Sequence, residues 1–386
     1  MLKYASLICG LLFVASCNFV NRKSSNEIAI DLCANYLLNN INEDGSFKTG
    51  KHINQSISFD QRYYLKQHAG AMSALCNYYH YKKHDNKTAL QLNKASGYLS
   101  KNFLDTVPNY PGLLAIWNSH KKKPDEACVG DAAMALSAFC LEQGINPYAP
   151  SPTKLFKLAG FILSMQKEDG SFFDLMNKEG ERFHPEKRNL MNQSRAILAL
   201  LDIYNLTKEE RFLIAANKAT SHLLNQYQTL RLNEYDFWFL LATEKLLNLN
   251  SKLTDQDLIT ALVVYRKSAC KRILEQQEMS EKESIFYGGF SKKGLINQST
   301  VKIIGLYACI DKQNIDTELE RALKEANNFL LTAQIKEGPH KGTFTKAISE
   351  LPGEGVLFNE KAGRIRLDYN YHALNAMIQH HNLFKN

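Results

Sequence analysis

The sequence predicts an all-α fold, a closed α/α toroid of about six helical hairpins in one domain. Apolar residues recur at spacings of three and four along the chain, and almost no segment alternates as a strand would. A turn also repeats, which indicates architecture. It reads Asn-Glu-Asp-Gly-Ser-Phe at 42–47 and Lys-Glu-Asp-Gly-Ser-Phe at 167–172, with looser versions at 287–290 and 337–344. We interpret these turns as structural, with glycine capping a helix and the aromatic ring packed beneath the loop.

The first 16 residues predict a lipoprotein signal peptide. Lys3 precedes an apolar run, residues 4–14, that is too short to span a bilayer. Residues 14–17 (Val-Ala-Ser-Cys) resemble a bacterial lipobox, which implies cleavage before Cys17 and lipidation of Cys17. Asn18 is not the aspartate that commonly retains lipoproteins in the inner membrane. We therefore expect an anchor in the outer membrane, facing the periplasm or the cell surface; the alternative is an ordinary secretory signal.

After a flexible tether of residues 17–26, the toroid domain is predicted to span 27–386. Amphipathic, charge-rich outer helices are expected at 27–41, 88–104, 152–167, 208–226, 255–277 and 316–334. Inner helices, less charged and rich in Ala, Gly and Ser, are expected at 64–82, 127–143, 191–206, 234–248, 297–311 and 368–382. One hairpin cannot bury its apolar face alone, so neighbouring hairpins must close on each other.

Cysteine usage indicates no zinc site. Beyond Cys9 and Cys17 there are six cysteines, and none forms a Cys-x-x-Cys pair or has zinc-finger spacing. We interpret them as small buried hydrophobic residues. A disulfide remains the alternative in an oxidising compartment, and the sequence does not pair them.

The charge pattern predicts an acidic ligand. The net charge is +8, and basic residues cluster in the loops that lead from outer to inner helices. In a toroid these loops share one rim with the positive ends of the inner-helix dipoles. We expect an anionic glycan or another small acidic ligand there. No nucleic-acid-binding motif is visible, so no nucleic-acid partner is predicted.

Polar and aromatic residues at the starts of the inner helices are the candidate site. Because these starts share a rim, we expect four potential proton carriers in one cavity, opening at the inner-helix N-termini: His68, Asp236, Asp368 and His372. The expected substrate-binding residues are Tyr63, Tyr64, Arg195, Trp238, Arg366 and Tyr369. Asp368 and His372 have usable metal spacing but lack a third ligand, so neither metal nor cofactor is predicted.

Several segments together resemble a bacterial and archaeal α/α-toroid family, itself similar to six-hairpin glycosidases and terpenoid cyclases. They are 68–70 (His-Ala-Gly), 196–200, 236–238 (Asp-Phe-Trp) and 365–374. The resemblance implies a fold and a pocket and leaves the reaction open. The family pattern often has an acidic residue at the start of the third and fifth inner helices, where this chain has Arg195 and Thr300.

Three function classes follow. The first is a periplasm-facing enzyme acting on an anionic glycan by hydrolysis, elimination or epimerisation, with a base such as His68 or Tyr371 for the last two. The second is a non-catalytic glycan-binding or scaffold lipoprotein, which the missing acidic positions favour. The third, more distant, is a terpenoid cyclase or prenyltransferase, and no Asp-rich cyclase motif is present. A bound sugar in the central cavity would discriminate among them.

Overall fold

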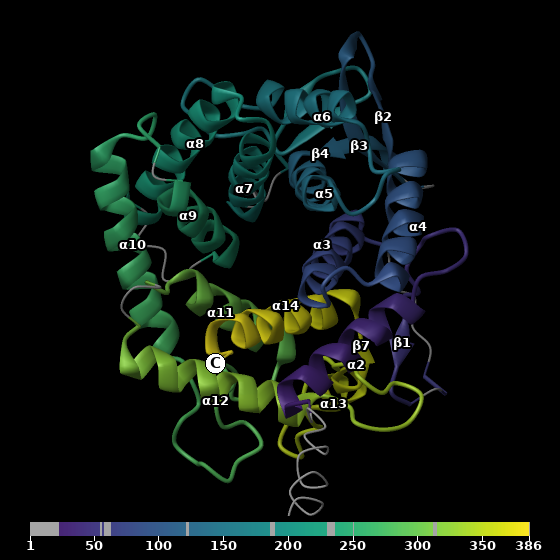
Figure 1. Cartoon of the computed structure of the whole chain (residues 1–386), viewed down its shortest axis with the longest axis vertical. Helices are drawn as coiled ribbons and strands as arrows, with labels where there is room; N and C mark the ends of the chain where they lie inside the picture. The colour runs from purple at the N-terminus through teal and green to yellow at the C-terminus, as the bar shows by residue number, and fades with distance from the viewer. Residues whose placement is uncertain are drawn as a thin grey trace, which may run out of the picture.

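A computed structural model describes residues 23–54, 56–57, 63–120, 123–185, 190–229, 236–249, 251–311 and 315–385. Within them, helices form two concentric rings around a central axis (Figure 1). The outer ring holds α2 (Ser25–Asn39), α4 (Asn86–Phe103), α6 (Pro152–Ser164), α8 (Glu210–Thr229), α10 (Gln256–Leu274) and α12 (Thr317–Ala333). The inner ring holds α3 (Leu65–Tyr81), α5 (Val129–Glu142), α7 (Leu190–Thr207), α9 (Phe237–Leu249), α11 (Ile296–Ala308) and α14 (Leu367–Phe384).

Both rings close. Each inner helix packs on the next one in chain order, and α14 packs on α3. The last outer helix, α12, contacts the first, α2. The predicted all-α toroid of six hairpins is therefore confirmed, with helix boundaries within a few residues of those expected. One difference is that α2 already begins at Ser25, capped by Ser24, inside the predicted tether of residues 17–26.

A five-stranded antiparallel sheet, which the sequence analysis missed, joins the second and third hairpins. Its strands are β2 (Leu104–Val107), β3 (Tyr110–His120), β4 (Lys123–Cys128), β5 (Leu175–Asn177) and β6 (Arg182–Phe183), paired in that order. The sheet lies near α4 and α6 at the periphery and leaves the helical core intact (Figure 1). Residues 113–117 are a continuous apolar run, and Ala115, Ile116 and Trp117 are buried, so the strand lacks the alternation that would have marked it.

Two smaller elements belong to the sixth hairpin. The strand β7 (Arg364–Ile365) pairs antiparallel with β1 (Lys51–His52) of the first hairpin. The short helix α13 (Val356–Ala362) precedes β7 in the loop between α12 and α14. The β1–β7 pair is a further contact, in addition to α14 on α3 and α12 on α2, that joins the end of the ring to its start.

The repeated turns fasten each outer helix to another one. Every turn glycine has a positive φ, and a Cβ added to it would lie 2.0–2.5 Å from a backbone carbonyl oxygen of an outer helix. Glycine is the residue that tolerates both conditions. The pairs are Gly45 with Lys94, Gly170 with Lys218, Gly288 with Glu325, and Gly342 with Leu32. The last pair joins the turn after α12 to α2 and so closes the ring.

Glutamine side chains reinforce three of these contacts. Gln166, Gln277 and Gln334 each donate from Nε2 both to the carbonyl of the turn glycine and to a carbonyl of the outer helix that the turn touches. The turn phenylalanines are buried, and each backbone N–H donates to a side chain at or just before an inner helix. The acceptors are Tyr63 for Phe47, Gln193 for Phe172, Ser299 for Phe290 and Asn370 for Phe344. Each turn thus connects three helices.

Gly342→Ala should destabilise the protein more than Gly338→Ala. Both glycines have positive φ, so alanine costs about 1–2 kcal/mol of backbone strain at either position. Only at Gly342 does the new Cβ meet Leu32 O at 2.2 Å, whereas nothing lies within 4 Å at Gly338. We expect an additional loss of about 1–3 kcal/mol in urea unfolding for Gly342→Ala. Equal losses in the two variants would contradict the ring-closing role.

A buried carboxyl at the end of α5 makes stability depend on pH. Glu142 has no solvent exposure, and its two oxygens accept from Ser96 Oγ at 2.6 Å and Asn146 Nδ2 at 2.8 Å. Burial raises the pKa of Glu142 from 4.5 to about 7 despite these two bonds. The native state therefore holds this proton more tightly than the unfolded chain does.

Glu142→Gln should flatten the pH dependence of stability. For wild type, the contribution of the protonated carboxyl is complete below pH 4.5 and is lost as the pH rises to about 7. The full loss is about 3 kcal/mol. The variant should match wild type near pH 4.5 and exceed it in free energy of unfolding at pH 8. Glu43→Gln, on an exposed side chain, is the control and should follow wild type.

Candidate functional site

A central cavity of about 510 Å³ lies between the inner helices. Its lining includes Gly70 of α3, Met134 of α5, Leu198 of α7, Phe237 and Trp238 of α9, Ile304 of α11, and Tyr371 and His372 of α14. It extends to the C-terminal ends of these helices, where the exposed Asn205 and Asn248 line it. This cavity opens at the end opposite to the predicted mouth. Residues 58–62, 186–189 and 230–235, which precede α3, α7 and α9 in the sequence, lie outside the described residues.

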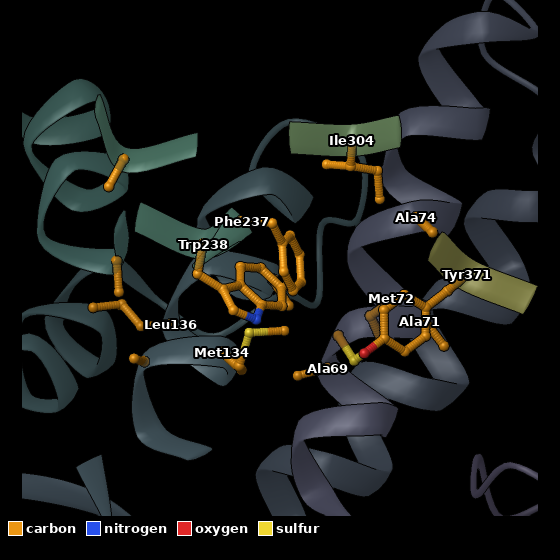
Figure 2. Packing of buried hydrophobic residues seen from close by; sticks show 14 of the residues in the cluster. Ala69, Ala71, Met72, Ala74, Met134, Leu136, Phe237, Trp238, Ile304 and Tyr371 are labelled. Atoms are coloured by element: carbon orange, nitrogen blue, oxygen red, sulfur yellow. The ribbon is translucent and has the colours of Figure 1, made fainter. Parts of the chain in front are cut away.

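Aromatic rings form the inner end of the cavity, here called the aromatic floor: Phe237, Trp238, Tyr371 and His372. Figure 2 shows Phe237, Trp238 and Tyr371 among the buried residues of the core. Ring centroids lie 4.5 Å apart for Phe237 and Trp238, 5.2 Å for Phe237 and His372, and 4.3 Å for Tyr371 and His372. Tyr371 fits because a Cβ at Gly70 would lie 2.5 Å from the tyrosine ring. The floor therefore depends on a glycine of α3.

Arg195 lies behind the aromatic floor and interacts with several ionisable groups. Its guanidinium carbon is 5.4 Å from the Trp238 ring centroid, and Nη1 donates to Asn192 Oδ1 at 3.2 Å. Burial, followed by the charge of Arg195, lowers the pKa of His372 to about 3, so this imidazole is neutral at neutral pH. The charge of Arg195 also lowers the pKa of Asp131 and Asp236, against the effect of burial. The centre of the toroid thus holds one arginine, two carboxyls and one neutral histidine.

The environment of both carboxyls raises their pKa. Burial raises the pKa of Asp236, although Ser194, Arg195 and the amides of α9 oppose that shift. Asp236 caps α9, since its Oδ1 accepts from Trp238 N–H at 2.9 Å. Burial likewise raises the pKa of Asp131, against the charges of Lys66 and Arg195. Perturbed carboxyls beside a cavity are typical of functional sites.

Asp368 is engaged differently. Both of its oxygens accept from Arg366, at 2.9 Å each, in a bidentate ion pair at the start of α14. Arg366 also lies over the Tyr369 ring, 5.4 Å from its centroid, and Tyr64 acts on Arg366 electrostatically. These four predicted residues therefore gather at the N-terminal end of α14. Tyr371 interacts with both this group and Arg195. Burial is the main cause that raises the pKa of Tyr371; Asp368 raises it further, and Arg195 and Arg366 lower it.

His68 and Tyr63 lie away from the cavity, between α3 and α4. The Tyr63 hydroxyl accepts from Phe47 N–H at 3.1 Å and lies 2.5 Å from His68 Nδ1; His68 Nε2 lies 2.9 Å from Ala95 O. Because a carbonyl can only accept, Nε2 carries the proton and Nδ1 accepts from Tyr63. Burial lowers the pKa of His68 to about 4. The structure thus separates His68 from the other proposed proton carriers. Through Tyr63, His68 instead stabilises the first repeated turn, which contains Phe47.

Sequence reasoning overlooked three features of the site. Asp131 is not among the predicted site residues, although an aspartate two residues into a small-residue helix is a usable signal. Tyr371 was noted only as a possible base. The polar C-terminal half of the cavity was not foreseen: Asn77 Nδ2 donates to Asn375 Oδ1 at 3.0 Å, and Lys245 pairs with Asp202. These side chains lie seven or more residues into their helices, whereas the predicted site residues lie at the helix starts.

Three further expectations concern metal, membrane and anchor. Among the residues that the structure describes, no group of three or more His, Cys, Asp or Glu side chains is arranged to hold a metal ion. No helix of the described ranges combines the length and apolarity that crossing a bilayer requires. Cys17, the predicted signal peptide and most of the tether lie outside the described residues.

The fold has relatives among solved structures. No protein-family profile matches the sequence, and no curated protein matches it by sequence. The GH76 α-1,6-mannanase of a Salegentibacter species superposes with a TM-score of 0.62 at 11% identity, covering 93% of this chain and 100% of the mannanase. Cellobiose 2-epimerase of Bacillus thermoamylovorans gives 0.61 at 12% identity, covering 90% and 95%. A D-mannose isomerase gives 0.66 at 10%, covering 94% and 99%. The chain therefore has the six-hairpin glycosidase-like α/α-toroid fold.

Proposed function

We propose that the protein binds a carbohydrate in the central cavity and acts on it by proton transfer, as a hydrolase, lyase or epimerase. The observation that carries the proposal is the aromatic floor, with Arg195 5.4 Å from the Trp238 ring and Asp236 capping the helix that carries Trp238. The similar structures include a mannanase, an epimerase and an isomerase of sugars, which supports the substrate class. The non-catalytic alternative is a sugar-binding protein that uses the same cavity.

The lining of the cavity is suited to a sugar. Its volume of about 510 Å³ lies within the range of roughly 300–1,000 Å³ typical of small-molecule sites. Trp238 offers an apolar ring against which the C–H face of a sugar can pack. Side-chain amides and hydroxyls then supply donors and acceptors for sugar hydroxyls: Ser73, Asn77, Ser137, Asn205, Asn248, Asn375 and Gln379.

The carboxyls and the arginine have distinct roles in this proposal. Asp236 and Asp131 are the acid–base groups, because burial favours their protonated forms. Arg195 stabilises negative charge that develops on the sugar during proton transfer. His372 is neutral and orients the sugar ring rather than carrying charge. Asp368, held in its ion pair with Arg366, fixes the start of α14.

Tryptophan fluorescence can test the binding site. The chain has two tryptophans: Trp117 is buried in the sheet, and Trp238 lies in the aromatic floor. In the Trp117→Phe variant, α-1,6-mannotriose, cellobiose, D-mannose or an oligouronate, whichever binds, should change the emission of Trp238. The Trp238→Phe variant should show no such change, and Trp238→Ala should weaken affinity by about tenfold or more. A sugar that binds with full affinity to Trp238→Ala would contradict the proposed site.

The acid–base role can be tested with Asp236→Asn. Asparagine is as good a helix cap as aspartate, so α9 should start normally and the melting temperature should change little. Asparagine cannot release a proton, so turnover of the bound sugar should fall by about 10²–10⁴ while its Kd stays within severalfold of wild type. Asp368→Asn is the matched comparison and should lower stability more than turnover. Full turnover by Asp236→Asn would contradict the acid–base role of this residue.

An acidic sugar is the finer part of the proposal. Cationic groups crowd where the first and sixth hairpins meet. The pKa of Lys51 is lowered mainly by burial and then by the charge of Lys48. The pKa of Lys346 is lowered mainly by burial and then by the charges of Lys361 and Arg364. Such crowding favours an anion. The cavity lining itself is nearly balanced, with Asp202 and Glu244 against Lys245. An acidic sugar should therefore bind more weakly as salt is raised, whereas a neutral one should not respond.

Membrane attachment through Cys17 is also proposed, on the strength of the lipobox-like residues 14–17. Several acyl chains on the new N-terminus would give a stable anchor. In cells, Cys17→Ser should leave the precursor unprocessed or release the protein from the membrane fraction. Intact mass and fractionation in a detergent-free lysate are the measurements. A variant that fractionates with membranes at unchanged mass would exclude the lipobox interpretation.

A further inference from the structure

Two cysteines of the fifth hairpin lie against each other. Cys270 is on the outer helix α10, and Cys309 caps the C-terminus of the inner helix α11. Cys309 Sγ lies 3.7 Å from Arg266 O. In an α-helix, the carbonyl of residue 266 accepts the N–H of residue 270, so Cys309 Sγ sits against the backbone of Cys270. The two thiols also shift each other's pKa, lowering that of Cys270 and raising that of Cys309.

The other described cysteines do not share this arrangement. Cys33 is fully buried and donates to Asn370 O at 3.4 Å, and Cys76 is also fully buried. Cys128 lies 3.8 Å from Asn192 Nδ2. Cys270 and Cys309 are both only partly buried. All six described cysteines carry free thiols in this structure.

We infer that Cys270 and Cys309 form a disulfide that ties α10 to α11 under oxidising conditions. The chain joins the outer and inner helices of this hairpin through the long connection 275–295. The crosslink would close a loop of about forty residues and restrict the unfolded chain. It would also fix α11, which contributes Ile304 to the cavity lining.

The chemistry is thiol–disulfide exchange with a disulfide-bonded donor, such as oxidised glutathione or a disulfide oxidoreductase. Cys270 loses its proton and attacks one donor sulfur, which breaks the donor S–S bond and releases a donor thiolate. Cys309 then loses its proton and attacks Cys270 Sγ, expelling the second donor thiolate. The two protons end on the donor thiols, so the donor is reduced as the pair is oxidised. The thiol of Cys309 lowers the pKa of Cys270, which suits Cys270 to the first attack.

Peptide mapping of the purified full chain tests the inference without any substitution. The protein is equilibrated with oxidised glutathione or with a reductant, alkylated in denaturant and digested with trypsin. We expect peptide 268–271 (Ser-Ala-Cys-Lys) linked to peptide 303–312 (Ile-Ile-Gly-Leu-Tyr-Ala-Cys-Ile-Asp-Lys) in the oxidised sample alone. Both peptides alkylated, or each carrying glutathione, after oxidation would overturn it. The assay does not depend on export or on Cys17.

Thermal unfolding provides the second measurement. Oxidation should raise the melting temperature of wild type by roughly 3–8 °C over the reduced protein. The Cys270→Ser/Cys309→Ser variant should show no difference between the two conditions. Cys140→Ser, at another partly buried cysteine, is the matched control and should keep the full shift. A shift that survives in the double variant or disappears in the control would assign the crosslink to other cysteines.

Discussion

The contact of a turn glycine with the backbone of an outer helix is the constraint on which the toroid depends. At Gly45, Gly170, Gly288 and Gly342 the missing Cβ lets one hairpin approach another at backbone distance. In a closed ring, unlike an open array, the last hairpin must contact the first. Here Gly342 meets Leu32, and Gln334 donates to Ala29 O, so the sixth hairpin is held to the first by the same device used elsewhere in the ring.

Ring closure also determines the shape of the site. Inner helices approach closely where small residues face a neighbour, as at Gly70 against Tyr371 and Gly130 against Asn192. Six inner helices in a ring leave a central space, which large side chains fill at the N-terminal part and leave open at the C-terminal part. The cavity is therefore bounded by the same aromatic residues that pack the core, and ligand binding there would act directly on the packing of the inner ring.

The sequence predicted the fold well because each hairpin repeats one pattern. Small-residue inner helices, charged outer helices and Gly-aromatic turns are local signals, and each occurs several times. The sheet escaped because the apolar run at 113–117 carries no alternation. The site was predicted less well, since helical spacing tells which residues share a face but not which neighbour that face meets. His68 contacts α4, whereas Gly70, two residues later, contacts Tyr371 across the inner ring.

Burial raises the pKa of all three carboxyls at the inner helix starts, and the carboxyls differ in their partners. Asp368 has a dedicated bidentate partner in Arg366, so its charge is neutralised locally and its main effect is to fix a helix start. Asp131 and Asp236 share the single cation Arg195, with Lys66 as a further influence on Asp131, and burial raises the pKa of both. The charge of Arg195 opposes this rise at both carboxyls. These raised pKa values, near rings able to bind a sugar, are the physical basis for assigning chemistry to this centre rather than to the histidines, whose pKa values burial lowers.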